Sequence, residues 1–260
     1  MQSHARWLFL FRQLLGRELA ARYRTTSLGT FWLVLQPLLM LGVYTMVFSG
    51  IFKVRWAGSE TTAGFALILF AGLLVFNFVA EVLTTSPSVI VSQPNYVKKV
   101  VFPVAILPVV KVAAAFVTAL VSLGILVVAN TIVTKTLSPR VLLGPIILLE
   151  MVPMLLAVAW SISAIGVYLR DLAQVIGIIA SVLLFISPIF FPPTSIPEGM
   201  RALIDLNPLV ICMQQLRAVT VQSLPLDLGA LGLHFCISVM AAVLSFQLFR
   251  RLSRGFADVL

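Results

Sequence analysis

The sequence predicts an all-α integral membrane protein, a single domain over residues 1–260 with six transmembrane helices. Of its 260 residues, 60% are hydrophobic and only 10% are charged, and the mean hydropathy of +1.09 is too high for a soluble domain. Uncharged apolar runs of helical length also recur along the whole chain. A basic amphipathic segment precedes the first run, and a proline-rich segment separates the last two.

Six uncharged runs match the roughly 20 residues that an apolar helix needs to cross the hydrocarbon layer. In chain order they are Thr25–Phe52, Thr61–Ala80, Val112–Thr134, Met151–Leu169, Leu172–Pro197 and Leu228–Phe249. Because the number of crossings is even, both termini are expected on the same side of the membrane.

The distribution of Lys and Arg predicts which side that is. If the N-terminus is inside, the inner connections hold eleven of these cations and the outer connections six, over nearly equal lengths. By the positive-inside rule both termini are cytoplasmic. The net charge of +9 lies in short runs between apolar segments, so it orients the chain in a bilayer, and no nucleic-acid partner is expected.

Residues 1–26 are predicted to form an amphipathic helix that lies along the inner leaflet. One face carries the apolar residues Leu8, Phe11, Leu15 and Leu19, and the opposite face carries Arg6, Gln13, Arg17 and Arg24. Arg22 departs from this pattern because its angle places it on the Leu19 side. We therefore expect Arg22 to point toward lipid headgroups or toward protein.

The segment 187–228, between spans five and six, is predicted to form two short re-entrant helices at the outer face. Ser195 and Glu198 have the spacing of a capping box, and Asn207 with Pro208 ends one helix and opens the next. Both helices are half apolar and too short to cross. Such backbone is tolerated only where protein or an aqueous cavity surrounds it, which indicates a pathway.

Several kinds of chemistry are not indicated. There is no phosphate-binding glycine loop, and no serine has a nucleophile-elbow sequence around it, so the chain is not predicted to be an enzyme or to bind ATP. His234 lies in an apolar span, where it is expected to be packed and hydrogen-bonded. Cys212 and Cys236 fit neither a disulfide framework nor a zinc site, and no metal or cofactor is expected.

Three ionisable residues lie in or at the ends of the spans, where a charge is costly: Glu81, Lys111 and Glu150. Counted from opposite membrane faces, Lys111 and Glu150 fall at similar depths and could pair across helices. The alternative is that these charges have no role in function: they form a structural ion pair, or they snorkel to the interface from a span end that is placed differently.

Several segments resemble permeases of the ABC-2 type, in particular those that export O-antigen-like polysaccharides on an undecaprenyl pyrophosphate lipid. The matching segments are Arg22 to Arg24 with Ser27, Gly29, Trp32 and Pro37; Asn95 to Pro103 with Pro108; Tyr168 to Asp171; Ser187 to Pro208; and Gly255 to Leu260. They follow the family's order and together cover almost the whole chain.

The resemblance implies a homodimeric channel in the bacterial inner membrane, coupled to two copies of a separate ABC ATPase. Spans one and five would line the conduit, the N-terminal helix would pack on the ATPase, and the outer short helices would act as a gate. The loop 86–103 would dock on the ATPase. Its coupling residues would be Asn95, Tyr96, Lys98, Lys99 and Phe102.

The same resemblance gives a candidate site for the lipid pyrophosphate. Arg22, Tyr23 and Arg24 stand at headgroup depth just before the span that would line the channel, and Arg22 is the strongest candidate. Anchoring to the membrane surface would explain most of the arginines equally well.

Aromatic residues could line the conduit, because sugar rings stack on aromatic faces. The candidates are Phe31, Trp32, Tyr44, Phe48, Phe185, Phe190 and Phe191. Interfacial belts and helix packing use the same residues.

Two other functions remain open. One is an ABC-2 permease for another lipid-linked polymer, such as a teichoic acid or capsule, or for a drug or lipid. Drug-type members would be expected to carry a large domain between spans one and two, where this chain has only the short connection 53–62. The other is an integral-membrane enzyme or scaffold, which the missing nucleophile and base disfavour.

Overall fold

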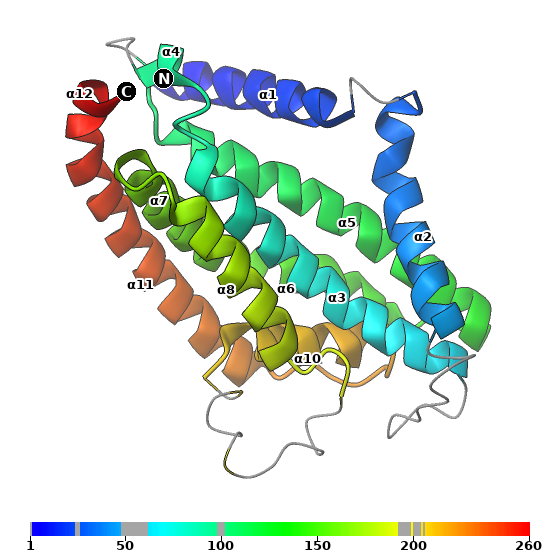
Figure 1. Cartoon of the computed structure of the whole chain (residues 1–260). Helices are drawn as coiled ribbons and strands as arrows, with labels where there is room; N and C mark the ends of the chain where they lie inside the picture. The colour runs from blue at the N-terminus through cyan, green and yellow to red at the C-terminus, as the bar shows by residue number, and fades with distance from the viewer. Residues whose placement is uncertain are drawn as a thin grey trace.

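A computed structural model of the chain describes residues 2–23, 27–47, 62–97, 102–191, 199, 204 and 206–260, and all regular structure within these ranges is helical (Figure 1). The α-helices are α1 Gln2–Tyr23, α2 Trp32–Val47, α3 Thr62–Thr85, α4 Pro94–Val97, α5 Ile106–Thr134, α6 Gly144–Glu150, α7 Val152–Tyr168, α8 Leu172–Ile186, α10 Pro208–Thr220, α11 Leu228–Leu252 and α12 Phe256–Val259. Short 3₁₀ turns join them: η1 Gly29–Phe31, η3 Ser86–Ser88, η4 Pro139–Leu143 and η6 Ser253–Gly255.

Five stretches of the described chain are long and apolar enough to span a membrane, which confirms a multi-pass protein. They are Gly29–Val47, Ala63–Ser88, Ile106–Thr134, Pro139–Tyr168 and Leu228–Val259. The expected fifth span is shorter: α8 has 15 residues and ends where Ser187 and Pro188 follow it. Five of the six expected spans are therefore found, and the fifth span, Leu172–Pro197, stays a prediction. Both termini lie at the same end of the molecule (Figure 1).

Helix α3 forms the centre of the bundle. Its sequence is apolar on every side, the pattern of a helix that is buried all round. Phe65, Leu69 and Val82 have at most 1% of their surface exposed, and helices α2, α5, α7, α8 and α10 all contact α3. This central position lets α3 present side chains to several neighbours at once.

Helix α1 lies across the end of the bundle that holds both termini (Figure 1). Its apolar face packs on protein: Leu14 is buried, in a cluster with Phe249 and Phe256, and Phe11 packs beside it. The predicted amphipathic pattern is confirmed in part, since Leu8 lies outside this contact and is 53% exposed. That α1 also lies along a leaflet stays a prediction.

Helix α10 is fixed in the core by a buried arginine. Arg217 is only 3% exposed, and its guanidinium donates to the carbonyls of Ile68, Pro188 and Ile189 at 2.9 to 3.2 Å. Burial lowers the pKa of Arg217 to about 10, which leaves it charged at neutral pH. Arg217 therefore joins α10 to α3 and to the turn that follows α8.

The N-terminus of α10 is fixed as well. As expected, Asn207 caps the helix, its side-chain oxygen accepting from the backbone N–H of Leu209 at 3.0 Å, and Pro208 occupies the first turn. The Asn207 amide also donates to Ser187 at 3.0 Å. The predicted capping box of Ser195 and Glu198 lies outside the described residues, and the re-entrant gate stays a prediction.

A glycine on α3 makes room for Arg217. A Cβ added to Gly72 would overlap the Arg217 guanidinium, so Gly72→Ala is expected to destabilise the protein by roughly 1–3 kcal/mol through overpacking. Thermal unfolding of the purified protein in detergent would measure the change. The matched control is Gly124→Ala on α5, where a Cβ meets nothing within 4 Å and helix propensity predicts a neutral or stabilising effect. Equal stability of both variants would contradict this packing.

Candidate functional site

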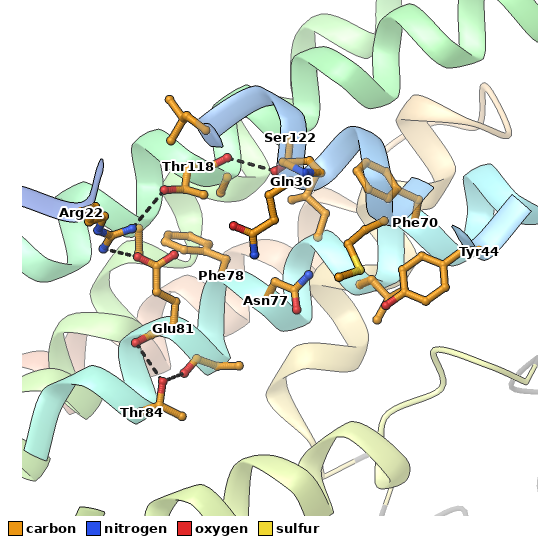
Figure 2. Close-up of a pocket in the computed structure, with 18 residues that line it drawn as sticks. Arg22, Gln36, Tyr44, Phe70, Asn77, Phe78, Glu81, Thr84, Thr118 and Ser122 are labelled. Atoms are coloured by element: carbon orange, nitrogen blue, oxygen red, sulfur yellow. Dashed lines mark hydrogen bonds and ion pairs between the residues drawn. The ribbon is translucent and has the colours of Figure 1, made fainter. Parts of the chain in front are cut away.

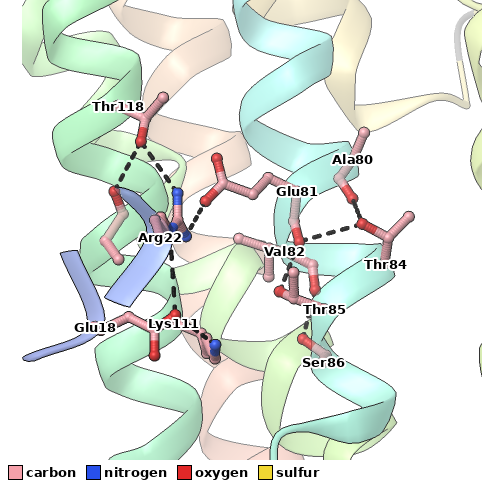
Figure 3. A network of polar contacts seen from close by, with 11 residues as sticks. Glu18, Arg22, Ala80, Glu81, Val82, Thr84, Thr85, Ser86, Lys111 and Thr118 are labelled. Atoms are coloured by element: carbon pink, nitrogen blue, oxygen red, sulfur yellow. Dashed lines mark hydrogen bonds and ion pairs between the residues drawn. The ribbon is translucent and has the colours of Figure 1, made fainter. Parts of the chain in front are cut away.

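Four charged side chains from three helices meet where α1 reaches the bundle (Figure 3). Arg22 of α1 forms an ion pair with Glu81 of α3 and donates to the Thr118 hydroxyl of α5 at 3.3 Å. Lys111 of α5 contacts Glu18 of α1 at 2.5 Å. Each of the four charged side chains is 17–22% exposed, and two cations balance two anions. This balance makes the charges tolerable at the edge of an apolar bundle.

The pairing of Lys111 with Glu150 considered from the sequence is wrong. Helix α5 begins at Ile106, so Lys111 lies in its second turn, beside α1, where Glu18 reaches it. Glu150 ends α6 and contacts His234 of α11, with Oε1 and Nδ1 2.5 Å apart. His234 is 9% exposed, which confirms the expectation of a packed, hydrogen-bonded histidine.

A cavity of about 500 Å³ opens beside the Arg22 ion pair, between α2, α3 and α5 (Figure 2). Its polar and aromatic lining residues are Arg22, Gln36, Tyr44, Phe70, Asn77, Phe78, Glu81, Thr84, Thr118 and Ser122. The lining changes along its length: Arg22 and Glu81 stand at one end, and Tyr44 and Phe70 at the other (Figure 2). The cavity therefore combines a charged mouth with an uncharged polar and aromatic interior.

Two side-chain amides occupy the middle of this cavity. Asn77 is the one exposed residue on α3 between Phe65 and Val79, and Gln36 is exposed on α2. Neither amide has a hydrogen-bond partner within the described residues, and Figure 2 shows both between the Arg22 end and the Tyr44 end of the cavity. Sequence reasoning missed both, because a single neutral amide in an apolar helix gives no periodic signal.

The residues expected to hold pyrophosphate are described only in part. Arg22 faces protein, one of its two expected directions, and its guanidinium stands at the cavity mouth. The backbone of Tyr23 ends α1, but its side chain and the whole of Arg24 lie outside the described residues. Any anion that Arg22 binds must compete with Glu81.

The loop expected to couple to an ATPase is attached to α1. Arg17 donates to the Tyr96 hydroxyl at 2.8 Å, and the Tyr96 ring stacks on Phe102 with centroids 4.3 Å apart. Asn95 is exposed, whereas Lys98 and Lys99 lie outside the described residues. α1 and this loop therefore form one connected surface.

The aromatic residues expected to line a conduit do not gather within one chain. Phe31 and Phe185 are 55% and 72% exposed, on segments that lie on opposite sides of α3 (Figure 1). The others have separate places: Trp32 is half-buried beside Phe31, Tyr44 lines the cavity, Phe190 packs on the main core, Phe191 packs near Ile204, and Phe48 lies outside the described residues. A conduit built from this set would need a second copy.

Glu150, Cys212 and His234 bring their ligand atoms within 4.8 Å of one another, a donor set that zinc accepts. Glu150 is already bonded to His234, and the Cys212 thiol lies 3.5 Å from its second oxygen. Burial, and then the charge of Glu150, raise the pKa of that thiol, which opposes the thiolate that a metal needs. Both oxygens of Glu150 therefore have partners within the cluster, whereas Nε2 of His234 is buried without a hydrogen-bond partner among the described residues. Sequence spacing did not indicate this cluster because its members come from three helices.

The fold and the site define a multi-pass helical membrane protein with a polar cavity beside its first span. The chain belongs to the ABC-2 type transporter family, whose sequence model matches residues 9–221. This membership confirms the resemblance drawn from the arginine, loop and proline motifs, and it makes the chain a transporter component.

Relatives over the full length carry a more specific name. A protein of Myxococcus xanthus named O-antigen export system permease protein RfbA is 27% identical over 251 residues, covering 96% of this chain and 94% of the relative. Two proteins of Klebsiella pneumoniae with the same name are 23% and 22% identical over 262 residues, covering all of this chain and 98% of each relative.

Proposed function

We propose that this chain is the permease subunit of an ATP-driven exporter that moves undecaprenyl-pyrophosphate-linked O-antigen-type polysaccharide across the bacterial inner membrane. The observation that carries the proposal is the similarity over the whole chain to three proteins named O-antigen export system permeases. The cavity supports it, because a charged mouth followed by a polar interior suits a cargo with a phosphate head and a sugar chain.

The exporter would contain two copies of this chain and two copies of a separate ATPase, with both termini in the cytoplasm. The sequence contains no phosphate-binding loop, and we propose that a separate ATPase hydrolyses the ATP. We propose that the partner docks on α1 and the loop 86–103, which Arg17 and Tyr96 hold together. The exposed aromatic residues Phe31 and Phe185 would face a conduit shared with the second copy.

At the inner leaflet, Arg22 would bind the pyrophosphate by exchanging its carboxylate partner. A phosphate offers the same charged oxygen atoms as Glu81, with a higher charge and more acceptors, and a guanidinium binds phosphate through two parallel hydrogen bonds. The Thr118 hydroxyl would keep the guanidinium in place during the exchange. Glu81 would then be free to turn toward water.

The proposal is tested by export in living cells. In a strain that lacks this chain, and in one whose neighbouring ATPase cannot hydrolyse ATP, lipid-linked polysaccharide should accumulate inside the cell and disappear from its surface. Restoring the wild-type chain to the first strain should restore surface polymer. Surface polysaccharide that persists in both strains would assign the chain to a different cargo.

A further inference from the structure

We propose that the cavity between α2, α3 and α5 is a saccharide site within a single chain, which binds the pyranose attached directly to the pyrophosphate. The inference rests on the proposed function and adds to it where the first sugar is held. Gln36 and Asn77 would bind the sugar hydroxyls, and the Tyr44 ring would pack against the sugar face.

The exposure of the two amides is the first reason. An amide on a membrane-spanning helix is costly when it faces lipid, so it is normally turned to a protein partner or to a polar cavity. Gln36 and Asn77 have no partner in the described part of the chain, yet both are exposed, and both line this cavity. Their hydrogen-bonding groups are therefore available to a polar ligand.

The helix backbone adds an acceptor at the same place. Pro37 lies inside α2 and has no N–H, so the carbonyl of Leu33 lacks its usual helical donor. Both residues line the cavity. The two amides supply donors and acceptors, and the Leu33 carbonyl and the Ser122 oxygen, whose hydroxyl donates to the Thr118 carbonyl, add acceptors. A sugar with several hydroxyls requires such a mixture.

The order of the lining residues gives the direction of the ligand. Arg22 stands at one end, the amides follow, and Tyr44 and Phe70 stand at the other end (Figure 2). A pyrophosphate held by Arg22 would place its first sugar between the amides, with the aromatic rings beyond. The volume of about 500 Å³ lies within the range of roughly 300–1,000 Å³ that small-molecule sites occupy.

The test compares two soluble lipids on the full chain in nanodiscs by calorimetry: farnesyl diphosphate, and the same lipid carrying one glucose on its diphosphate. The wild type should bind the glycosylated lipid at least about fivefold more tightly, since one net hydrogen bond contributes about 1 kcal/mol. Asn77→Leu should remove about fivefold of affinity for the glycosylated lipid and leave farnesyl diphosphate unchanged.

Two further variants keep the test decisive. Gln36→Leu removes the second amide from a different helix, so it reports on the site even if Asn77→Leu fails to fold. Gln247→Leu is the matched control, because Gln247 is exposed on α11 and does not line the cavity. It should bind both lipids like the wild type.

The outcomes separate the two proposals. Equal wild-type affinity for the two lipids, or an equal loss for both lipids in the amide variants, would overturn the saccharide site and leave the pyrophosphate site standing. Failure of the wild type to bind either lipid would overturn the pyrophosphate site, and the saccharide site with it.

Discussion

Arg22→Ala should abolish surface export of lipid-linked polysaccharide and weaken binding of farnesyl diphosphate by about 30-fold or more. Removing one partner of a partly buried, charge-assisted phosphate contact costs at least about 2 kcal/mol. Export is read as surface polymer at equal membrane levels of the protein, and affinity by calorimetry in nanodiscs. The matched control for affinity is Arg12→Ala, because Arg12 is exposed on α1 and does not line the cavity. It should bind farnesyl diphosphate like the wild type.

Glu81→Gln distinguishes a phosphate site from a merely structural ion pair. If Arg22 binds pyrophosphate, removing the competing carboxylate should tighten the binding of farnesyl diphosphate, because Arg22 no longer exchanges one anion for another. If the pair only stabilises the fold, Glu81→Gln and Arg22→Ala should lower the unfolding temperature alike, and neither should change the affinity. The second pattern would remove Arg22 from the transport mechanism.

Arg217→Met should destabilise the protein by roughly 3–5 kcal/mol, the largest effect on stability that we expect. Methionine fills a similar length of side chain but leaves the carbonyls of Ile68, Pro188 and Ile189 without the charged donor that now pairs with them. A buried acceptor that loses its partner costs about 1–3 kcal/mol. Thermal unfolding in detergent measures the loss.

A second arginine in the same region provides the control for Arg217. Arg140 also donates to a backbone carbonyl, that of Ser223, but it does so at the exposed surface. Arg140→Met should therefore cost less than about 1 kcal/mol. Similar losses in the two variants would mean that burial does not decide the contribution of Arg217.

The spans could be predicted from the sequence because uncharged runs of helical length are a local property. The ends of the spans are harder to predict, because an ionisable residue interrupts an uncharged run whether or not it has a partner in the fold. α5 begins six residues earlier than its predicted span, since Lys111 finds Glu18, and α3 continues past its predicted end, since Glu81 finds Arg22. Those partners lie far away in the sequence, so no local pattern indicates them.

The candidate site could be predicted only in part. Arg22 can be selected from the sequence because it breaks the helical pattern of its own segment, and the structure gives it a partner on the apolar side. Gln36 and Asn77 could not be selected, because their importance depends on two helices leaving a cavity between them. The cluster of Glu150 and His234 likewise required the tertiary arrangement.

The contacts of α1 also have a mechanical consequence. Arg17 holds Tyr96, and Arg22 holds Glu81, five positions further along one continuous helix. That separation is about 7.5 Å along the helix axis, too short for an α-helix to bend appreciably. We therefore expect a displacement of the Tyr96 loop to be transmitted through this rigid segment of α1 to Glu81, without any rearrangement of the spans.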